Sequence, residues 1–284
     1  MSNLRPQRQF FAEEIAAVAN LRTRRLIEAL ASVPRERFLP PGPWHVASEG
    51  TIPAGPRTTI DADPRHVYHN YAVAIDPARS LFNGSPALLA GTIDALQLTD
   101  GARVLHIGAG LGYYSAILGH VVGPAGRVLA LEVDAALAER AASNVESMPW
   151  IEVRADSGVT VPEAFDAILV NAGVTHPQRA WLDALVPGGR LILPVTATIP
   201  AMGPIGKGVM VLVINTGAMD WSARVLTFVA IYSAVGLRDD EVNSQLGQAL
   251  MRTPFPRLSR LRRDAHERET ACWLHAPHCC MSQN

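Results

Sequence analysis

The chain has 284 residues, of which 48% are hydrophobic and 18% are charged, and its formal net charge is -1. This is the composition of an ordinary globular protein, and the small net charge gives no reason to expect a nucleic-acid or membrane partner. We see no signal-like apolar start and no run of the ~18 apolar residues that a membrane span needs. The three cysteines lie near the C-terminus, which predicts no disulfide framework. The default expectation is a cytoplasmic enzyme.

The N-terminal part is predicted to be an arm. Apolar residues at helical spacing over residues 9–38 predict one or two helices. The stretch Pro40–Arg65 is rich in proline and glycine, which predicts an irregular segment without a core of its own. We divide the chain into an arm at residues 1–85, a core at 86–237 and a C-terminal extension at 238–284. The arm and the extension are expected to pack on the single core domain.

Residues 86–195 alternate between helical and strand patterns. The predicted strands are residues 103–107, 127–132, 150–154, 166–170 and 190–195. Helical stretches lie between most of them. This alternation predicts the α/β class, with a doubly wound, mostly parallel sheet and helices on both of its faces.

The pattern changes after the last of these strands. Val209–Ile214 and Ala223–Ser233 are long β-prone runs with a turn around Gly217, which predicts an antiparallel hairpin at the sheet edge. Residues 238–265 are predicted to be helical and arginine-rich. Thr270–His275 is expected to form a last short strand.

Three glycines follow the strand at residues 103–107. Gly108, Gly110 and Gly112 remove Cβ atoms where the backbone must turn sharply and where a ligand must lie against it. A strand, a glycine turn and a helix N-terminus together form a nucleotide-sized cradle. The third glycine comes early and position 113 is tyrosine, which favours a single nucleoside over the pyrophosphate of a dinucleotide.

Acidic residues end the next two strands. Glu132 comes 24 residues after Gly108, where a carboxylate can accept hydrogen bonds from ribose hydroxyls. The alternative for Glu132 is a solvated strand end. Asp156 ends the third strand and could meet an adenine amino group.

Together these features resemble the class I S-adenosylmethionine-dependent methyltransferases. The resemblance implies a Rossmann-like methyltransferase sheet and S-adenosyl-L-methionine as cofactor. The residues that match the family's cofactor site are Gly108, Gly110, Gly112, Glu132, Asp156, Ser157 and Asn171. Asn171 matches the position that faces the active site.

Within this class, the chain is most similar to the protein-L-isoaspartate O-methyltransferases, over residues 10–195. The segments that carry the similarity are Val33–Phe38 (Val-Pro-Arg-Glu-Arg-Phe), the glycine loop, Phe165–Val170 and Pro187–Pro194. The first string is the specific one, because methyltransferases in general lack it. The family fold implies that the N-terminal arm helps to cover the substrate site.

One segment departs from that family. The family carries Thr-Ile-Ser-x-Pro before the helix that leads to the glycine loop, with its Ser at the active site, whereas this chain has Phe82–Pro86 (Phe-Asn-Gly-Ser-Pro). Aligned on the proline, Gly84 takes the place of the Ser, and Ser85 supplies a hydroxyl one residue later. We therefore expect a different acceptor, with Asn83, Ser85 and Tyr71 as candidate contacts.

Methyl transfer mainly requires that nucleophile, methyl carbon and sulfur are aligned. A carboxylate nucleophile is already ionised at pH 7, whereas a hydroxyl or an amine needs a base. The candidate bases are His176, His69, His66 and Asp76. His176 follows the fourth strand, where an α/β sheet places its active site, and its alternative is a surface residue. The candidate catalytic residues are therefore Ser85, Asn83 and His176.

His106 stands at a strand end where many methyltransferases have an acidic residue. We expect a neutral histidine satisfied by the backbone, and the alternative is a hydrogen bond near the methionine part of the cofactor.

Two other patterns allow a bland and a functional interpretation. The string Cys272-x-x-His275-x-x-His278-Cys279-Cys280 has metal-capable ligands, but no second pair lies at finger-like spacing. We expect no metal there, and an exposed, oxidation-prone cysteine pair.

The arginines at residues 252–268 could bind an anionic substrate or RNA, but nearby acids favour a solvated, salt-bridged helix.

The leading hypothesis is an S-adenosylmethionine-dependent O-methyltransferase acting on a carboxylate or hydroxyl of a peptide or small molecule. The alternatives are isoaspartyl protein repair, an RNA or protein N-methyltransferase, and a cofactor-binding scaffold without chemistry.

Overall fold

The computed structural model describes residues 3–47, 55–161, 163–199, 203–218 and 220–283. The chain divides into two compact units, one made of residues 1–102 and 109–155 and the other of residues 103–108 and 156–284. Each unit is described by itself. In the described residues, no helix is both long enough and apolar enough to span a membrane.

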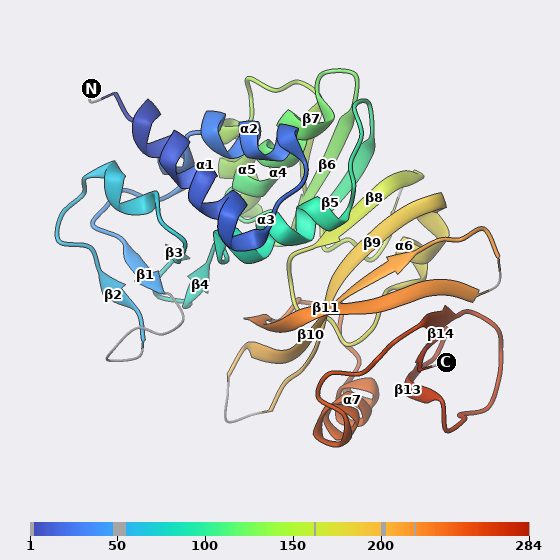
Figure 1. The fold of residues 1–284 in the computed structure, drawn as a ribbon. Coiled ribbons are helices and arrows are strands. Elements are labelled where there is room, and N and C mark those ends of the chain that lie inside the picture. Colours follow the sequence, from blue (N-terminus) through green and yellow to red (C-terminus); the bar gives the residue numbers. More distant parts are fainter. Residues whose placement is uncertain (1–2, 48–54, 162, 200–202, 219, 284) are drawn as a thin grey trace. The chain divides into compact units, whose positions relative to one another are not determined.

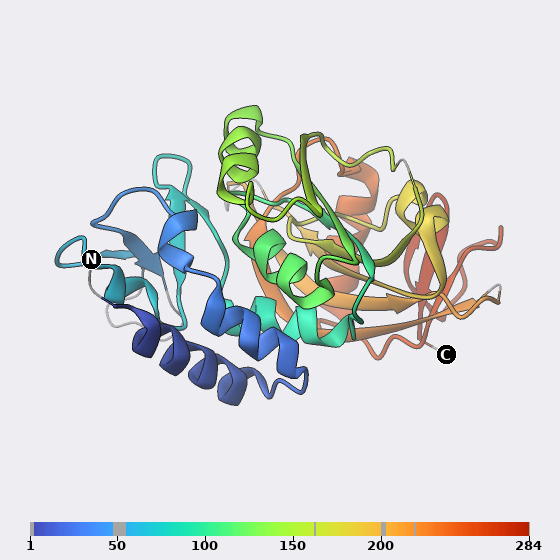
Figure 2. The same cartoon turned by 90° about the horizontal axis from the view of Figure 1, so that it is seen from above.

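Helices form one side of the first unit. Helix α1 (Arg5–Ala19) packs against α2 (Arg24–Ser32) and α3 (Pro86–Ala95). Figure 2 shows the blue helices of residues 5–32 lying side by side. Their apolar faces are buried, as the helical spacing predicts, and a short 3₁₀ helix, η1 (Arg35–Phe38), follows.

A small antiparallel sheet follows in the order β2-β1-β3-β4. Its members, with one intervening 3₁₀ helix, are β1 (His45–Ala47), β2 (Arg57–Thr58), η2 (Pro64–Val67), β3 (Ala72–Asp76) and β4 (Leu81–Phe82). The prediction that residues 40–65 are irregular and coreless is therefore wrong, because β1 and β2 join this sheet and Trp44 and Val46 are buried. Residues 48–54 lie outside the described residues. Local composition hides such pairing, which depends on β3.

The first unit also contains two parallel strands, β6 (Arg127–Glu132) and β7 (Ile151–Ala155). Helices α4 (Tyr113–Val122) and α5 (Ala135–Asn144) pack against them. Both strands agree with the predicted ranges within one residue.

The second unit is built on strands in the order β13-β14-β12-β11-β10-β9-β8-β5. Strands β5 (Arg103–Ile107), β8 (Phe165–Val170) and β9 (Leu185–Ala197) are parallel, and α6 (Arg179–Ala184) precedes β9. Their apolar runs are almost fully buried, as is typical of parallel strands in an α/β protein. The predicted parallel strands are confirmed.

The antiparallel part is larger than predicted (Figure 1). Strands β10 (Ile205–Ile214) and β11 (Asp220–Tyr232) form the predicted hairpin. The prediction that this hairpin ends the sheet is wrong, because β11 pairs with β12 (Arg260–Arg262), which pairs with β14 (Cys279–Ser282). Strand β14 then pairs with β13 (Cys272–Ala276), which is the predicted last strand.

The predicted helix at residues 238–265 is also too long. Helix α7 covers only Asp240–Arg252, and β12 lies inside the predicted range. Pro254 and Pro256 explain the end, because proline lacks the amide hydrogen that a continuing helix needs. The predicted ion pairing of the arginines is present, since Arg262 pairs with Asp264 and Glu269.

Candidate active site

Two glycines of the glycine loop lie in the first unit. Gly110 and Gly112 have φ angles of +56° and +87°, which disfavour L side chains. A Cβ on Gly110 would lie 3.1 Å from Ile75 Cδ1, and one on Gly112 would lie 3.3 Å from the Cβ of Ala141. The positive φ angles therefore favour glycine at both positions, and little room is left for a Cβ.

Glu132 fixes this loop from the end of β6. The side chain is buried, and Oε2 accepts a hydrogen bond from the backbone N–H of Gly110 at 2.8 Å. Oε1 accepts from the backbone N–H of Asp134 at 3.1 Å. Burial raises the pKa of the Glu132 carboxyl, and the two N–H groups partly offset this. The alternative of a solvated strand end is wrong.

The remaining oxygen lone pairs of Glu132 fit the ribose of the expected cofactor. Each carboxylate oxygen has two lone pairs, so a bond to the loop leaves acceptor capacity for a ribose hydroxyl. The carboxylate thus holds the loop while retaining the chemistry that the sequence predicts for it.

In the second unit, Gly108 and Asn171 lie together at the ends of β5 and β8. A Cβ on Gly108, whose φ is +82°, would lie 3.1 Å from the carbonyl oxygen of Asn171. The backbone N–H of Asn171 donates to the carbonyl of Ile107 at 2.8 Å. Two predicted site residues 63 positions apart in sequence are therefore neighbours.

The predicted adenine-side pair lies in a tight turn of the same unit. Asp156 is exposed, and its Oδ1 accepts from the backbone N–H of Gly158 at 2.7 Å. The carbonyl of Gly158 accepts from the buried indole of Trp181 at 2.7 Å. Ser157 is half-buried between these residues. The sequence did not predict a role for Trp181, because a buried tryptophan is usual in a core and its hydrogen bond to the turn is visible only in the fold.

Two candidate histidines of the second unit are buried. Burial lowers the pKa of His106 to about 4, so it is neutral at pH 7, as predicted. His176 is not a surface residue, and its Nδ1 lies 2.9 Å from the hydroxyl of Thr175. Burial, followed by the adjacent ring of His278, lowers its pKa to about 4. His176 is therefore a weak base.

Ser85 precedes α3 in the first unit. Its hydroxyl donates to Oδ1 of Asn70 at 3.3 Å, and the backbone N–H of Ala87 donates to the same oxygen at 3.0 Å. Asn70 is thus a shared acceptor that orients Ser85. It was not predicted, because nothing near it in sequence marks it.

Asn83 is held between two partners. Its Oδ1 accepts from the backbone N–H of Val73 at 2.9 Å and from the guanidinium of Arg35 at 3.4 Å. These two donors identify the oxygen of the amide, so the other terminal atom is the nitrogen. Within the described part of the chain, that buried Nδ2 has no hydrogen-bond partner.

Arg35 binds the backbone of residues 67–71, which precede Asn83 and Ser85 in the chain. It is fully buried and donates to the carbonyls of Val67, His69 and Tyr71 at 2.6, 3.1 and 2.8 Å. Arg35 belongs to the family-specific string Val33–Phe38, which explains why that string matters. The available signal for Arg35 in the sequence was its place in that string.

The departure at Gly84 has a structural counterpart. Its φ is +83°, and a Cβ there would lie 2.9 Å from Leu89 Cδ2. A serine at this position would therefore be strained. The left-handed backbone at Gly84 therefore accompanies the shift of the hydroxyl from position 84 to Ser85.

Two of the other predicted bases, Asp76 and His66, are engaged in ion pairs. The carboxylate of Asp76 binds Arg79 at 2.6 Å, which lowers the pKa of Asp76. His66 contacts Asp61 at 2.9 Å, and His69 is exposed. Burial raises the pKa of Tyr71. The ion pair with Arg79 makes Asp76 a poor general base.

A parallel sheet with a three-glycine loop, followed by a strand that ends in a buried acid, defines the class I S-adenosylmethionine-dependent methyltransferases. Residues 54–203, just over half of the 284 residues, match the family model described as Protein-L-isoaspartate(D-aspartate) O-methyltransferase. The chain belongs to this family.

Curated relatives support the assignment. A Protein-L-isoaspartate O-methyltransferase 1 from Rhodopseudomonas palustris is 32% identical over 196 residues, which is 67% of this chain and 70% of the relative. A Protein-L-isoaspartate O-methyltransferase from Aeropyrum pernix is 30% identical over 198 residues, which is 67% of each chain.

Solved structures share the fold. One, entitled protein-L-isoaspartate O-methyltransferase, has a TM-score of 0.62 at 21% identity and covers 90% of this chain and 73% of its own. A putative protein-L-isoaspartate O-methyltransferase from Plasmodium falciparum, in complex with S-adenosyl-L-homocysteine, has a TM-score of 0.58 at 16% identity and covers 80% and 98%. The predicted family resemblance, fold class, enzyme class and cofactor are confirmed.

Proposed function

We propose that the protein methylates a carboxylate of an isoaspartyl residue in a peptide or protein. The observation that carries the proposal is the buried Nδ2 of Asn83, which has no hydrogen-bond partner in the described residues. An unused buried donor suits an anionic oxygen, and it does not suit a protonated amine. The names of the relatives favour the isoaspartyl carboxylate over other carboxylates and hydroxyls.

The cofactor is assigned to the residues that the family pattern predicts. Glu132 accepts from the ribose, the glycines Gly108, Gly110 and Gly112 leave the backbone open to the nucleoside, and Asp156 with Ser157 meets the adenine. Asn171 borders the reacting end. When bound, S-adenosylmethionine supplies an activated methyl group on a sulfonium.

The acceptor side supplies donors and orientation. The Nδ2 of Asn83 donates to the carboxylate, and Arg35 fixes the side chain of Asn83. Ser85 can donate its single hydroxyl hydrogen to the carboxylate only when it releases Asn70. A carboxylate at pH 7 needs no proton removed. This agrees with the low pKa of His176 and with the ion pair of Asp76, since neither is a good base.

The test is transfer of a labelled methyl group to an isoaspartyl peptide, with the same peptide carrying ordinary aspartate as the control. We expect a base-labile label on the isoaspartyl peptide alone. A base-stable label would favour the N-methyltransferase alternative. Cofactor binding without transfer to any peptide would favour the scaffold.

A variant tests the donor. Asn83→Asp keeps the oxygen that Val73 and Arg35 bind, but replaces Nδ2 by an anionic oxygen. We expect kcat/KM for the peptide to fall by about tenfold or more, because the carboxylate loses a donor and meets a like charge. Cofactor affinity should be unchanged. Asn20→Asp adds the same charge at an exposed site and is the matched control. Equal activities of the two variants would remove Asn83 from the acceptor site.

A further inference from the structure

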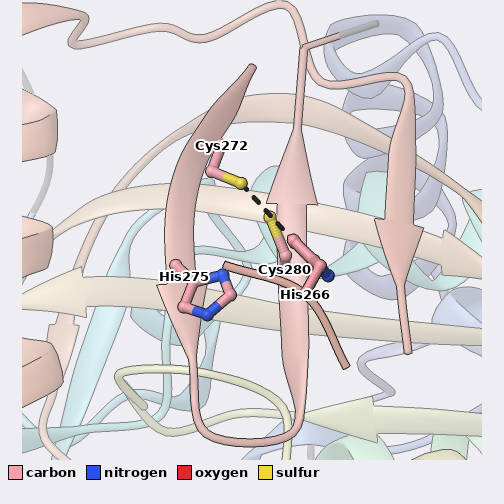
Figure 3. A group of neighbouring side chains, drawn as sticks. All are labelled: His266, Cys272, His275 and Cys280. Atoms are coloured by element: carbon pink, nitrogen blue, oxygen red, sulfur yellow. Dashed lines mark hydrogen bonds between the residues drawn. The ribbon is translucent and has the colours of Figure 1, made fainter. Parts of the chain in front are cut away.

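Four metal-binding side chains gather in the C-terminal strands, outside the residues assigned to methyl transfer. They are His266, Cys272, His275 and Cys280, and one ligand atom from each lies within 4.8 Å of all the others (Figure 3). Cys280 is fully buried, Cys272 is nearly so, and the two histidines are half-buried. The prediction of an exposed cysteine pair at Cys279 and Cys280 is wrong, because both thiols are buried.

Strand pairing brings three of these residues together. His275 on β13 faces Cys280 on β14 in the antiparallel register. Cys272 and His275 are three residues apart, so a regular strand would place them on opposite faces. The register shifts between Cys272 and Leu274, and such a bulge re-aims a side chain. The bulge thus accounts for Cys272 joining the group.

His266 reaches the group from the segment before β13. Its Nδ1 donates to the backbone carbonyl of Asp264 at 3.0 Å, which leaves the lone pair on Nε2. That Nε2 lies 3.7 Å from the sulfur of Cys272. A carbonyl on one ring nitrogen is the usual way to orient a histidine whose other nitrogen binds a metal.

The other two contacts also suit metal ligands. The backbone N–H of Glu269 donates to the sulfur of Cys272 at 3.4 Å, which stabilises a thiolate. Nδ1 of His275 is buried and has no hydrogen-bond partner among the residues that the structure describes. A buried ring nitrogen without a partner is costly unless a ligand satisfies it.

We propose that His266, Cys272, His275 and Cys280 bind one zinc ion in a closed structural site. Two thiolates and two imidazoles are a common tetrahedral zinc set, and a site with four protein ligands leaves no position for substrate. On binding, each cysteine releases its proton to solvent, so the ion and its two thiolates are neutral together. A neutral group is suited to this largely buried place.

The ion would join β13 and β14 to the segment that contains His266. Metal binding then stabilises these strands, because the ligands are gathered only in the folded chain. The site explains why a short terminal hairpin keeps two half-buried histidines against two buried thiols. It does not depend on the methyl-transfer proposal.

The experiment measures the metal content of the full chain, purified without a histidine tag, after dialysis against a weak chelator. We expect about one zinc per chain. Replacement by cobalt should give the visible absorption and thiolate charge-transfer bands of a tetrahedral site. Cys280→Ser and His266→Gln should each lose most of the metal.

Two neighbours serve as matched controls. Cys279 is the adjacent buried cysteine on β14, and His278 instead contacts the carbonyl of Pro177. Cys279→Ala and His278→Gln should therefore keep the zinc. Metal-free wild-type protein with a Cys272–Cys280 disulfide would overturn the proposal, as would equal zinc loss in ligand and control variants. The cobalt spectrum of the wild type decides the question even if a ligand variant fails to fold.

Discussion

A buried charged side chain binds the backbone of the glycine loop at residues 108–112, and another binds the backbone of the acceptor arm at residues 35–86. The first side chain is an acidic hydrogen-bond acceptor and the second is a basic donor. Glu132 accepts a backbone N–H from a loop only 22 residues away. Arg35 donates to backbone carbonyls 32 to 36 residues away. The loop also has its shape fixed by the conformations of Gly110 and Gly112, whereas in the arm one guanidinium binds the carbonyls of Val67, His69 and Tyr71. We infer that the two regions should fail differently when their charged residue is removed.

The largest effect is expected at Arg35. Arg35→Leu removes the donor of the carbonyls of Val67 and Tyr71, and each unsatisfied buried group costs about 1–3 kcal/mol. The carbonyl of His69 keeps the N–H of Tyr71 at 2.9 Å. We expect the free energy of unfolding, measured with urea, to fall by about 3–5 kcal/mol. Arg37 belongs to the same string but is exposed, so Arg37→Leu should cost less than about 0.5 kcal/mol. Similar losses in the two variants would show that the arm does not depend on Arg35.

The strand leading into the glycine loop carries a buried histidine whose pKa makes stability depend on pH. The pKa of His106 is about 4 in the folded chain against an ordinary 6.5, so the unfolded chain binds the extra proton first. Stability is therefore complete above pH 6.5 and is lost as the pH falls toward about 4, by about 3 kcal/mol. Urea unfolding across this range should show a shallower pH dependence in His106→Gln. The exposed His69 gives the control, since His69→Gln should keep the wild-type slope.

Glu132 should matter more for the cofactor than for the fold. Glu132→Ala removes the carboxylate that we propose as the acceptor of ribose, a charged hydrogen bond worth about 1.5–3 kcal/mol. Calorimetry should therefore show cofactor affinity falling roughly 10- to 100-fold. Glu132→Gln keeps one oxygen for Gly110 and should lose less. Glu139, an exposed acid on α5, is the control. Unchanged affinity in Glu132→Ala would separate the loop from cofactor binding.

The comparison also explains what the sequence could predict. Gly108, Gly110 and Glu132 could be singled out from the sequence because they follow short-range order: a strand, a turn and the next strand end. Asn70 and Trp181 were not found, because each acts on a residue that only folding brings near.

The C-terminal strands show the same limit more strongly. The pattern Cys272-x-x-His275 was visible in the sequence, but the pairing of β13 with β14 and the bulge near Cys272 were not. His266 lies outside the string from Cys272 to Cys280. The sequence also does not show that the backbone carbonyl of Asp264 orients the ring of His266. A set of metal ligands that comes from several strands can therefore be identified only after the strand register is known.

The smallest effect concerns Gly84, where the family carries its active-site serine. Gly84→Ser puts an L side chain at a φ of +83°, which costs about 1–2 kcal/mol, and its Cβ meets Leu89 as well. Gly188 has a φ of +82° with open space around it, so Gly188→Ser measures the backbone cost alone. We expect Gly84→Ser to be the more destabilised variant in urea, and methyl transfer to the isoaspartyl peptide not to rise. Higher transfer without lower stability would contradict this, because it would mean that the arm accepts the family's serine unchanged and that Ser85 is not its substitute.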